Sequence, residues 1–206
     1  MDFNALAAEC APWVAPQTMA AIVKTESQFH PLVIGINGGA RLTRQPASKD
    51  EAVVTAKWLI NNGYNIDLGL GQVNSNNLLK IGLSVEDAFD PCRNLTAAAT
   101  ILTWSYQSAL RKTQNEQSAL HAAISAYNTG SFSRGFSNGY VQKVINNVSY
   151  SEASPLSTAM PPLPIPLASG HKPATKQRAR AAKKTTQTQT LSATPESDRQ
   201  DVMVYR

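Results

Sequence analysis

The sequence predicts a mainly α-helical domain over residues 1–150, followed by a proline-rich and basic tail over residues 151–206. Apolar residues recur at helical spacing in several stretches of the first part, whereas strand signals are weak throughout. Seven of the twelve prolines fall after Ser151. A tail of this composition buries too little apolar surface to offset its ordering entropy. We therefore expect one helical domain with a disordered C-terminal tail.

Helices are expected along the whole first part of the chain, joined by polar loops. They cover approximately residues 2–10, 16–30, 49–61, 95–112, 116–127 and 140–148. Ser48 and Glu51 have the spacing of a capping box at the start of the third helix. Asn94 is placed to cap the long helix that follows it.

Charge is divided unevenly between the two parts of the chain. Residues 1–150 carry 11 Lys and Arg against 10 Asp and Glu, and residues 151–206 carry 8 against 4. Most of the positive excess belongs to the tail, so the high pI gives no reason to expect a nucleic-acid partner for the main domain. The basic tail suits an anionic surface or a partner protein, although a solvated tail that binds nothing specific is commoner.

Two kinds of targeting signal are missing from the sequence. No run of about 18 apolar residues is present, so we expect no transmembrane segment. The first ten residues lack the basic and apolar regions of a signal peptide. Either the protein is exported by another route, or the sequence begins after the leader or at a downstream start.

Within residues 18–31, a glutamate lies on the apolar side of the predicted helix, where a charged side chain is unfavourable. Met19, Ile22 and Val23 form an apolar helical stripe, and Glu26 occupies the next position of that stripe. Partial burial would raise the pKa of the carboxyl, and a glutamic acid that stays neutral near neutral pH can act as a general acid. The alternative is a half-buried face from which Glu26 reaches solvent at its edge.

The helix expected over residues 116–127 repeats this pattern. Its apolar stripe ends at Tyr127, as the earlier stripe ends at Glu26. Two such helices could bring the hydroxyl of Tyr127 and the carboxyl of Glu26 together. An ordinary core tyrosine with a hydrogen-bonded hydroxyl explains the pattern equally well.

Residues 64–77 form a segment rich in glycine and amide side chains. Gly69 and Gly71 let the backbone approach another group closely, and Gln72 and Asn74 supply hydrogen-bond donors and acceptors. The segment is a poor phosphate cradle, because the third glycine of a dinucleotide motif and the lysine of a P-loop are missing. Its composition predicts a polar binding loop.

Cys10 and Cys92 match no metal-ligand spacing. A disulfide between them would fit an oxidising compartment and stabilise the fold by about 3–4 kcal/mol, and two buried free thiols are the alternative. A cysteine hydrolase that uses His30 or His121 is conceivable, but neither cysteine lies in a recognisable nucleophile setting. The zinc motif H-E-x-x-H and the nucleophile elbow G-x-S-x-G are both missing.

Three segments carry a resemblance to a known family. E-S-Q-F-H-P at 26–31, G-L-G-Q-V-N at 69–74 and S-A-Y-N-T-G at 125–130 resemble the signatures of the lytic transglycosylases related to goose-type lysozyme. Over about residues 4–148 the chain looks like the specialised transglycosylases of VirB-type (type IV) secretion systems. The resemblance implies a lysozyme-like helical fold, no cofactor and no metal. It also implies cleavage of the β-1,4 bond between N-acetylmuramic acid and N-acetylglucosamine.

The resemblance also assigns residues. Glu26 matches the catalytic acid, and Ser27 follows it as in the family. The positions that match the lining of the glycan cleft are Gln72, Val73, Asn74, Tyr127 and Asn128. Cys10 and Cys92 fall where relatives carry a cysteine pair, which implies the disulfide. His30 departs from the pattern, because many members have asparagine before the proline, and the geometry of that loop is the feature it affects.

Most glycosidases use two carboxylates, but only Glu26 lies in a convincing constellation here. Asp67 lies near the glycine-rich segment and could be a second carboxylate, but an exposed loop charge is the expectation. With one acid, Glu26 protonates the leaving oxygen, the substrate's N-acetyl group stabilises the developing charge, and Glu26 then takes the proton of the C6 hydroxyl. Tyr127 would position the carboxyl or the acetamido group. The expected product carries a 1,6-anhydro end.

The expected role is local opening of periplasmic peptidoglycan for a type IV secretion or conjugation system. Secretion components are the expected protein partners, with the tail over residues 151–206 as one point of contact. A non-enzymatic peptidoglycan-binding assembly factor is the alternative. A hydrolytic lysozyme would instead release reducing ends.

Overall fold

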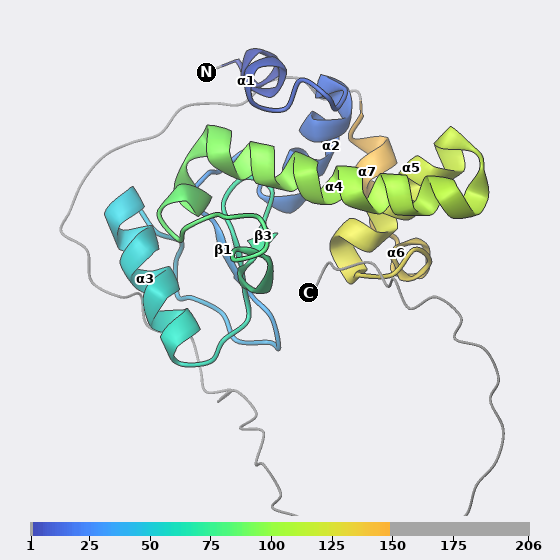
Figure 1. Cartoon of the computed structure of the whole chain (residues 1–206). Helices are drawn as coiled ribbons and strands as arrows, with labels where there is room; N and C mark the ends of the chain where they lie inside the picture. Colours follow the sequence, from blue (N-terminus) through green and yellow to red (C-terminus); the bar gives the residue numbers. More distant parts are fainter. Residues whose placement is uncertain (1, 149–206) are drawn as a thin grey trace, which may run out of the picture.

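The computed structural model describes residues 2–148. The predicted tail, and with it the boundary at residue 150, lies outside the described residues. The described part is mainly α-helical, as the sequence predicts (Figure 1). Its helices are α1 (Phe3–Cys10), α2 (Pro16–Glu26), α3 (Lys49–Asn61), α4 (Pro91–Thr113), α5 (Glu116–Thr129), α6 (Arg134–Ser137) and α7 (Tyr140–Asn146). Its strands are β1 (Ile34–Ile36), β2 (Ile66–Leu68) and β3 (Val73–Asn74), and short 3₁₀ turns cover Ser75–Asn77 and Asp87–Phe89.

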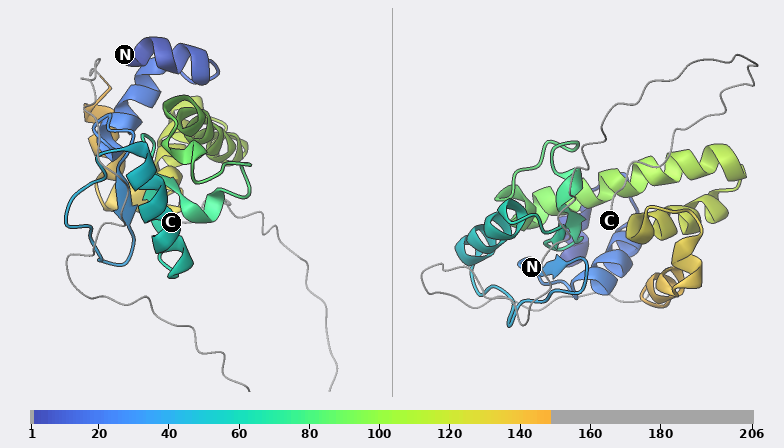
Figure 2. Two further views of the ribbon diagram at one scale, coloured as in Figure 1. Left: turned by 90° about the vertical axis from the view of Figure 1, so that its left-hand side faces the viewer. Right: turned by 90° about the horizontal axis from the view of Figure 1, so that it is seen from below.

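Helix α4 is the longest element and connects the two ends of the domain. It packs against α5 in its second part and against α1 near its start. Two further views place α3 and the strands toward one end of α4 and α5 to α7 toward the other (Figure 2). The buried side chains of Met19, Ile22, Leu59 and Leu95 belong to one core that joins these elements.

A disulfide joins the end of α1 to the first turn of α4. Cys10 and Cys92 are bonded, with their Cα atoms 5.2 Å apart. The hydroxyl of Thr96 donates to the carbonyl oxygens of both cysteines, at 2.7 and 2.9 Å. The pairing implied by the resemblance is therefore present. It removes the cysteine-hydrolase interpretation, because neither cysteine is a free thiol.

The three strands form an antiparallel sheet in the order β1-β2-β3, which the weak strand signals did not predict. Ile34 lies opposite Leu68, and Asp67 lies opposite Asn74. Successive side chains point to opposite faces of a sheet. The apolar side chains of Ile34, Ile36, Ile66, Leu68 and Val73 therefore share one face, and Gly35, Asp67 and Asn74 share the other. Strands of two or three residues are too short to stand out from their flanking loops in the sequence.

Helix α4 starts earlier than the sequence predicted, and its cap is a different residue. Asp90 is the N-cap, since its side chain accepts a hydrogen bond from the backbone N–H of Arg93 at 2.9 Å. Pro91 follows in the first turn, where its missing N–H has no cost. The predicted cap of α3 is confirmed, because the Ser48 hydroxyl accepts from the N–H of Glu51 at 3.2 Å.

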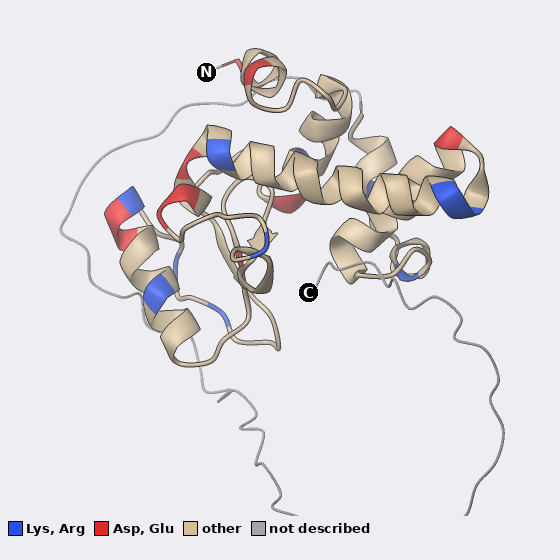
Figure 3. Cartoon of the chain, viewed as in Figure 1, with Lys and Arg blue, Asp and Glu red and all other residues tan. Residues whose placement is uncertain are grey.

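Ion pairs lie around α3 and the segment before α4. Arg44 contacts Glu51 at 2.5 Å, Arg93 contacts Asp87 at 3.2 Å, and Lys57 pairs with Glu86. The hydrogen bond from Arg44 holds the pKa of the Glu51 carboxyl below its usual value. Acidic residues lie at the start of α3 and just before α4 (Figure 3). These pairs link α3 to the loop before it and to the turn before α4, and they lie largely at the surface.

Candidate functional site

Glu26 is the last residue of α2, and its carboxyl is held by a tyrosine of α7, a helix that packs against α2. Pro16 begins the helix, and Met19, Ile22 and Val23 on its apolar side are fully buried. Glu26 itself is half-buried. The hydroxyl of Tyr140, at the start of α7, donates to Oε1 of Glu26 at 2.6 Å. A short hydrogen bond of this kind fixes the orientation of the carboxyl.

The chain reverses direction directly after Glu26. Ser27 is buried, and its N–H and hydroxyl both bond to the carbonyl oxygen of Val23. Gln28 and Phe29 both adopt positive φ, at 54° and 66°, which is unusual for side chains other than glycine. The ring of Phe29 packs edge-on against Phe3 of α1, with ring centroids 5.1 Å apart. This packing holds the strained turn that carries the carboxyl.

His30 lies on the surface of this turn. Its side chain is exposed, and its N–H donates to the carbonyl oxygen of Ser27 at 3.1 Å. The departure from the family pattern at this position therefore falls outside the buried part of the turn.

Gly69 and Gly71 let the backbone approach α4 and α5. A Cβ atom on Gly69 would lie 2.3 Å from the carbonyl oxygen of Ala88, and one on Gly71 would lie 2.6 Å from Cβ of Ala98. The hydroxyl of Tyr127 donates to the carbonyl oxygen of Gly71 at 2.5 Å. The group that this segment approaches closely is thus the helical core itself.

Asn94 joins this segment to α4 instead of capping the helix. Its side chain is buried and accepts from the N–H of Gly71 at 2.8 Å. It also donates to the carbonyl oxygens of Leu68 and Ala88, at 2.8 and 2.7 Å. One amide therefore holds the end of β2 and the glycine turn against the start of α4.

The residues after the second glycine are buried. Nε2 of Gln72 donates to the carbonyl oxygens of Val33 and Gly69, both at 3.0 Å, and its backbone has a positive φ of 49°. Val73 belongs to the apolar face of the sheet. Asn74 is 3 % exposed, and its amide nitrogen donates to the carboxyl of Asp67 at 2.7 Å.

The expectation for Asp67 was wrong. Instead of an exposed loop charge, Asp67 is a strand residue with 6 % exposure. Its two carboxyl oxygens accept hydrogen bonds from the amides of Asn37 and Asn74. The charge is tolerated because it has hydrogen-bond partners inside the fold.

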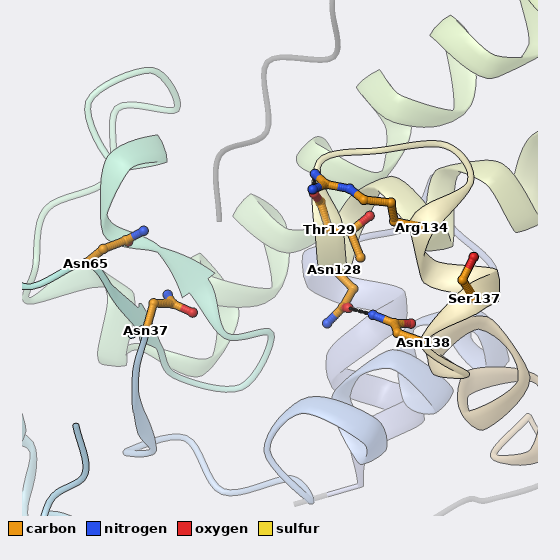
Figure 4. A pocket seen from close by; sticks show the side chains of 7 residues that line it. All are labelled: Asn37, Asn65, Asn128, Thr129, Arg134, Ser137 and Asn138. Carbon is orange, nitrogen blue, oxygen red and sulfur yellow. Dashed lines mark hydrogen bonds between the residues drawn. The ribbon is translucent and has the colours of Figure 1, made fainter. Parts of the chain in front are cut away.

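An open groove with a volume of about 690 Å³ lies between two walls (Figure 4). Asn37 and Asn65 line the side next to the strands, which we call the sheet wall. The opposite side, which we call the helical wall, is lined by Asn128, Thr129, Arg134, Ser137 and Asn138. Arg134 is the charged member of this set, and the rest are amides and hydroxyls. Such a lining suits an uncharged, hydroxyl-rich ligand.

The helical wall connects to Glu26 through Tyr140. Nδ2 of Asn138 donates to Oδ1 of Asn128 at 3.1 Å, and Oδ1 of Asn138 accepts from the N–H of Tyr140 at 3.0 Å. The ring of Tyr140 then reaches back to the carboxyl. Of the residues predicted to line a glycan cleft, Asn128 lines this groove. Ser27, Gln72, Val73, Asn74 and Tyr127 lie buried behind the surface, and their role in binding stays a prediction.

Two further findings concern metal binding and membrane crossing. Within residues 2–148, no group of three or more His, Cys, Asp or Glu side chains is arranged to hold a metal ion. In the same range, no helix combines the length and hydropathy needed to cross a membrane.

Sequence reasoning missed Tyr140 and most residues that line the groove, namely Asn37, Asn65, Thr129, Arg134, Ser137 and Asn138. Tyr140 begins the last helix expected from the sequence; its ring is buried there, but its hydroxyl bonds to Glu26. Asn37 and Asn65 flank the alternating segments I-G-I and I-D-L. That alternation is the signal that could have placed them on one sheet face.

Comparisons with known proteins agree with the three sequence signatures. The sequence model of the transglycosylase SLT domain matches residues 3–148. The chain is 51 % identical over 151 residues to the type IV secretion system protein virB1 of Brucella suis biovar 1, covering 70 % of this chain and 63 % of that protein. It is 43 % identical over 144 residues to the protein virB1 of Agrobacterium fabrum, covering 69 % and 58 % respectively. The chain thus spans less than two thirds of the length of these relatives. No solved structure matches the chain significantly.

Proposed function

Because the chain belongs to the transglycosylase SLT domain family, we propose that it is a lytic transglycosylase that cleaves peptidoglycan. The substrate bond is the β-1,4 link between N-acetylmuramic acid and N-acetylglucosamine, and the product end is a 1,6-anhydro sugar. The observation that carries this proposal is the Glu26 carboxyl, half-buried at the end of α2 and held by the Tyr140 hydroxyl at 2.6 Å.

Glu26 acts first as the general acid. Its proton passes to the oxygen that links the two sugars, and the bond from that oxygen to C1 of the muramic acid breaks. The positive charge that develops at C1 is stabilised by the carbonyl oxygen of the substrate's own acetamido group. The hydroxyl of Tyr140, which donates to Oε1 of Glu26, holds the carboxyl in position for this transfer.

Glu26 acts next as the base. The carboxylate takes the proton of the C6 hydroxyl of the same sugar, and O6 forms a bond to C1. The acid is thereby regenerated, and no water is consumed. Asp67 is unsuited to the role of a second catalytic carboxylate, because its two oxygens already accept hydrogen bonds from Asn37 and Asn74 inside the sheet.

The groove between the sheet wall and the helical wall is the proposed glycan site. Its amides and hydroxyls match the acetamido and hydroxyl groups of a glycan strand. Ser27, Gln72, Val73, Asn74 and Tyr127 shape the cleft from behind, and Asn128 contacts the sugar directly.

The names of the relatives support a proposal for the cellular role. Proteins named type IV secretion system protein virB1 are 51 % identical to the matched part of this chain. We therefore propose a periplasmic role, in which cleavage opens the cell wall locally for assembly of such a system. Secretion components would be the protein partners.

Digestion of purified cell-wall sacculi tests the activity. The wild-type protein should release fragments with 1,6-anhydro ends, identified by mass spectrometry. Replacement of Glu26 by Gln keeps the shape of the side chain but removes its proton, so release should fall by about a thousandfold. A matched control is Glu9→Gln, which changes an exposed glutamate of α1 and should leave the rate unchanged.

Two results would contradict the proposal. Reducing ends in place of anhydro ends would identify a hydrolase. No release by the wild-type protein, combined with binding to sacculi, would favour the peptidoglycan-binding assembly factor.

A further inference from the structure

The sheet wall presents two amides whose orientation is set from behind. Ile36 lies opposite Ile66, and the N–H of Asn37 donates to the carbonyl oxygen of Asn65 at 2.9 Å, which extends the pairing by one residue. Asn37 and Asn65 are therefore cross-strand neighbours on the same face as Asp67. Their side chains point from the strands toward the helical wall (Figure 4).

Asp67 fixes the orientation of the first amide. Its Oδ2 accepts from Nδ2 of Asn37 at 3.0 Å. An ionised carboxylate has no hydrogen to donate, so the amide that faces it must present its nitrogen. Asn37 is consequently left with its oxygen toward the groove.

Asp67 fixes the second amide through Asn74. Nδ2 of Asn74 donates both to Oδ1 of Asp67 and to Oδ1 of Asn65, each at 2.7 Å. Oδ1 of Asn74 accepts from the N–H of Asn76 at 3.0 Å, which excludes the flipped orientation. Since Asn65 accepts with its oxygen, its nitrogen is left toward the groove.

The sheet wall therefore offers one acceptor, Oδ1 of Asn37, beside one donor, Nδ2 of Asn65. Within residues 2–148, the hydrogen bonds of these two amides are made by their other atoms, Nδ2 of Asn37 and Oδ1 of Asn65. An acetamido group carries the complementary pair, an N–H and a C=O. We propose that Asp67 is a positioning residue that sets these two amides to recognise an acetamido group of the glycan. This inference rests on the proposed function, because it specifies how the same groove recognises a group of its substrate.

Replacement of Asp67 by Asn tests whether residue 67 orients the two groove amides, without changing the size of the side chain. The new amide must direct its NH₂ at either Asn37 or Asn74, both of which already present NH₂. One groove amide must then turn over. Binding is measured by calorimetry in the Glu26→Gln background, where nothing is turned over. The probes are N-acetylglucosamine tetrasaccharide and the glucose tetrasaccharide of cellulose, which has hydroxyls in place of acetamido groups.

We expect Asp67→Asn to weaken binding of the acetylated probe about tenfold and to leave binding of the glucose probe unchanged. The exchange Asp67→Asn with Asn37→Asp restores the pattern, because the amide placed at position 67 donates to the carboxylate placed at position 37, whose other oxygen faces the groove. This double variant should recover affinity for the acetylated probe to within about threefold of its parent. Replacement of a residue that only supported the fold would lower the affinity for both probes equally.

Three results would overturn the inference. They are an unchanged affinity of Asp67→Asn for the acetylated probe, an equal loss for both probes, and no recovery in the double variant. Failure of the proposed function has a separate signature, because it appears as missing anhydro ends in digests by the wild-type protein.

Discussion

The sheet wall and the helical wall of the groove are built in different ways. In the sheet wall, the groove amides are tied to a buried carboxylate, and the adjoining glycine turn is tied to Asn94, each with several hydrogen bonds. In the helical wall, Asn138 is exposed and bonds to Asn128 at 3.1 Å at the surface. The difference teaches that the sheet wall is specified together with the fold, whereas the helical wall can vary without disturbing the core.

The largest expected effect is on the support of the sheet wall. Asn94→Ala removes three hydrogen bonds in the interior, one from the N–H of Gly71 and two to the carbonyl oxygens of Leu68 and Ala88. The free energy of unfolding should fall by about 3 kcal/mol, measured by urea denaturation. The exposed Asn76→Ala is the control and should change it by less than about 0.5 kcal/mol. An equal loss in the free energy of unfolding for the two variants would show that Asn94 gives the sheet wall no special support.

An intermediate effect is expected where the helical wall connects to the carboxyl of Glu26. Tyr140→Phe keeps the packed ring but removes the hydroxyl that bonds to Glu26. We expect about a tenfold lower rate of anhydro-end release, with a change in the free energy of unfolding below about 1 kcal/mol. Tyr106→Phe in α4 serves as the control. A rate equal to wild type would show that Tyr140 does not orient the carboxyl.

The smallest effect is expected at the surface of the helical wall. Asn138→Ala removes an exposed amide that bonds to Asn128 and to the backbone N–H of Tyr140. The KM for soluble glycan fragments should rise about threefold, because one polar contact at the rim of a groove contributes little. Thermal unfolding should be unchanged. A loss of stability as large as that of Asn94→Ala would mean that the two walls are built alike.

The helical side of the molecule was largely predictable from the sequence. Stripes of period 3.6 located α2 and α5, and the end of the α2 stripe marked Glu26 as unusual. The helix expected over residues 116–127 extends only two residues further, to Thr129. Asn128 followed from the resemblance and lines the groove.

The sheet side was not predictable in the same way, because its polar residues point inward. From their positions in the sequence, Asp67 was expected to be an exposed loop charge and Asn94 a helix cap. The sequence alone does not show that each has partners far along the chain. The hydrogen bonds of Asn94 reach Leu68 and Gly71, which lie 26 and 23 residues away. Such partners are defined only once the glycine turn packs against α4.

The measurement that tests the central claim most directly is digestion of sacculi in water enriched in oxygen-18. If Glu26 both gives and recovers the proton and O6 attacks C1, the released sugar ends should carry no oxygen-18. The Glu26→Gln variant should release almost nothing. Labelled reducing ends from the wild-type protein would show that water attacks C1, and would contradict the account.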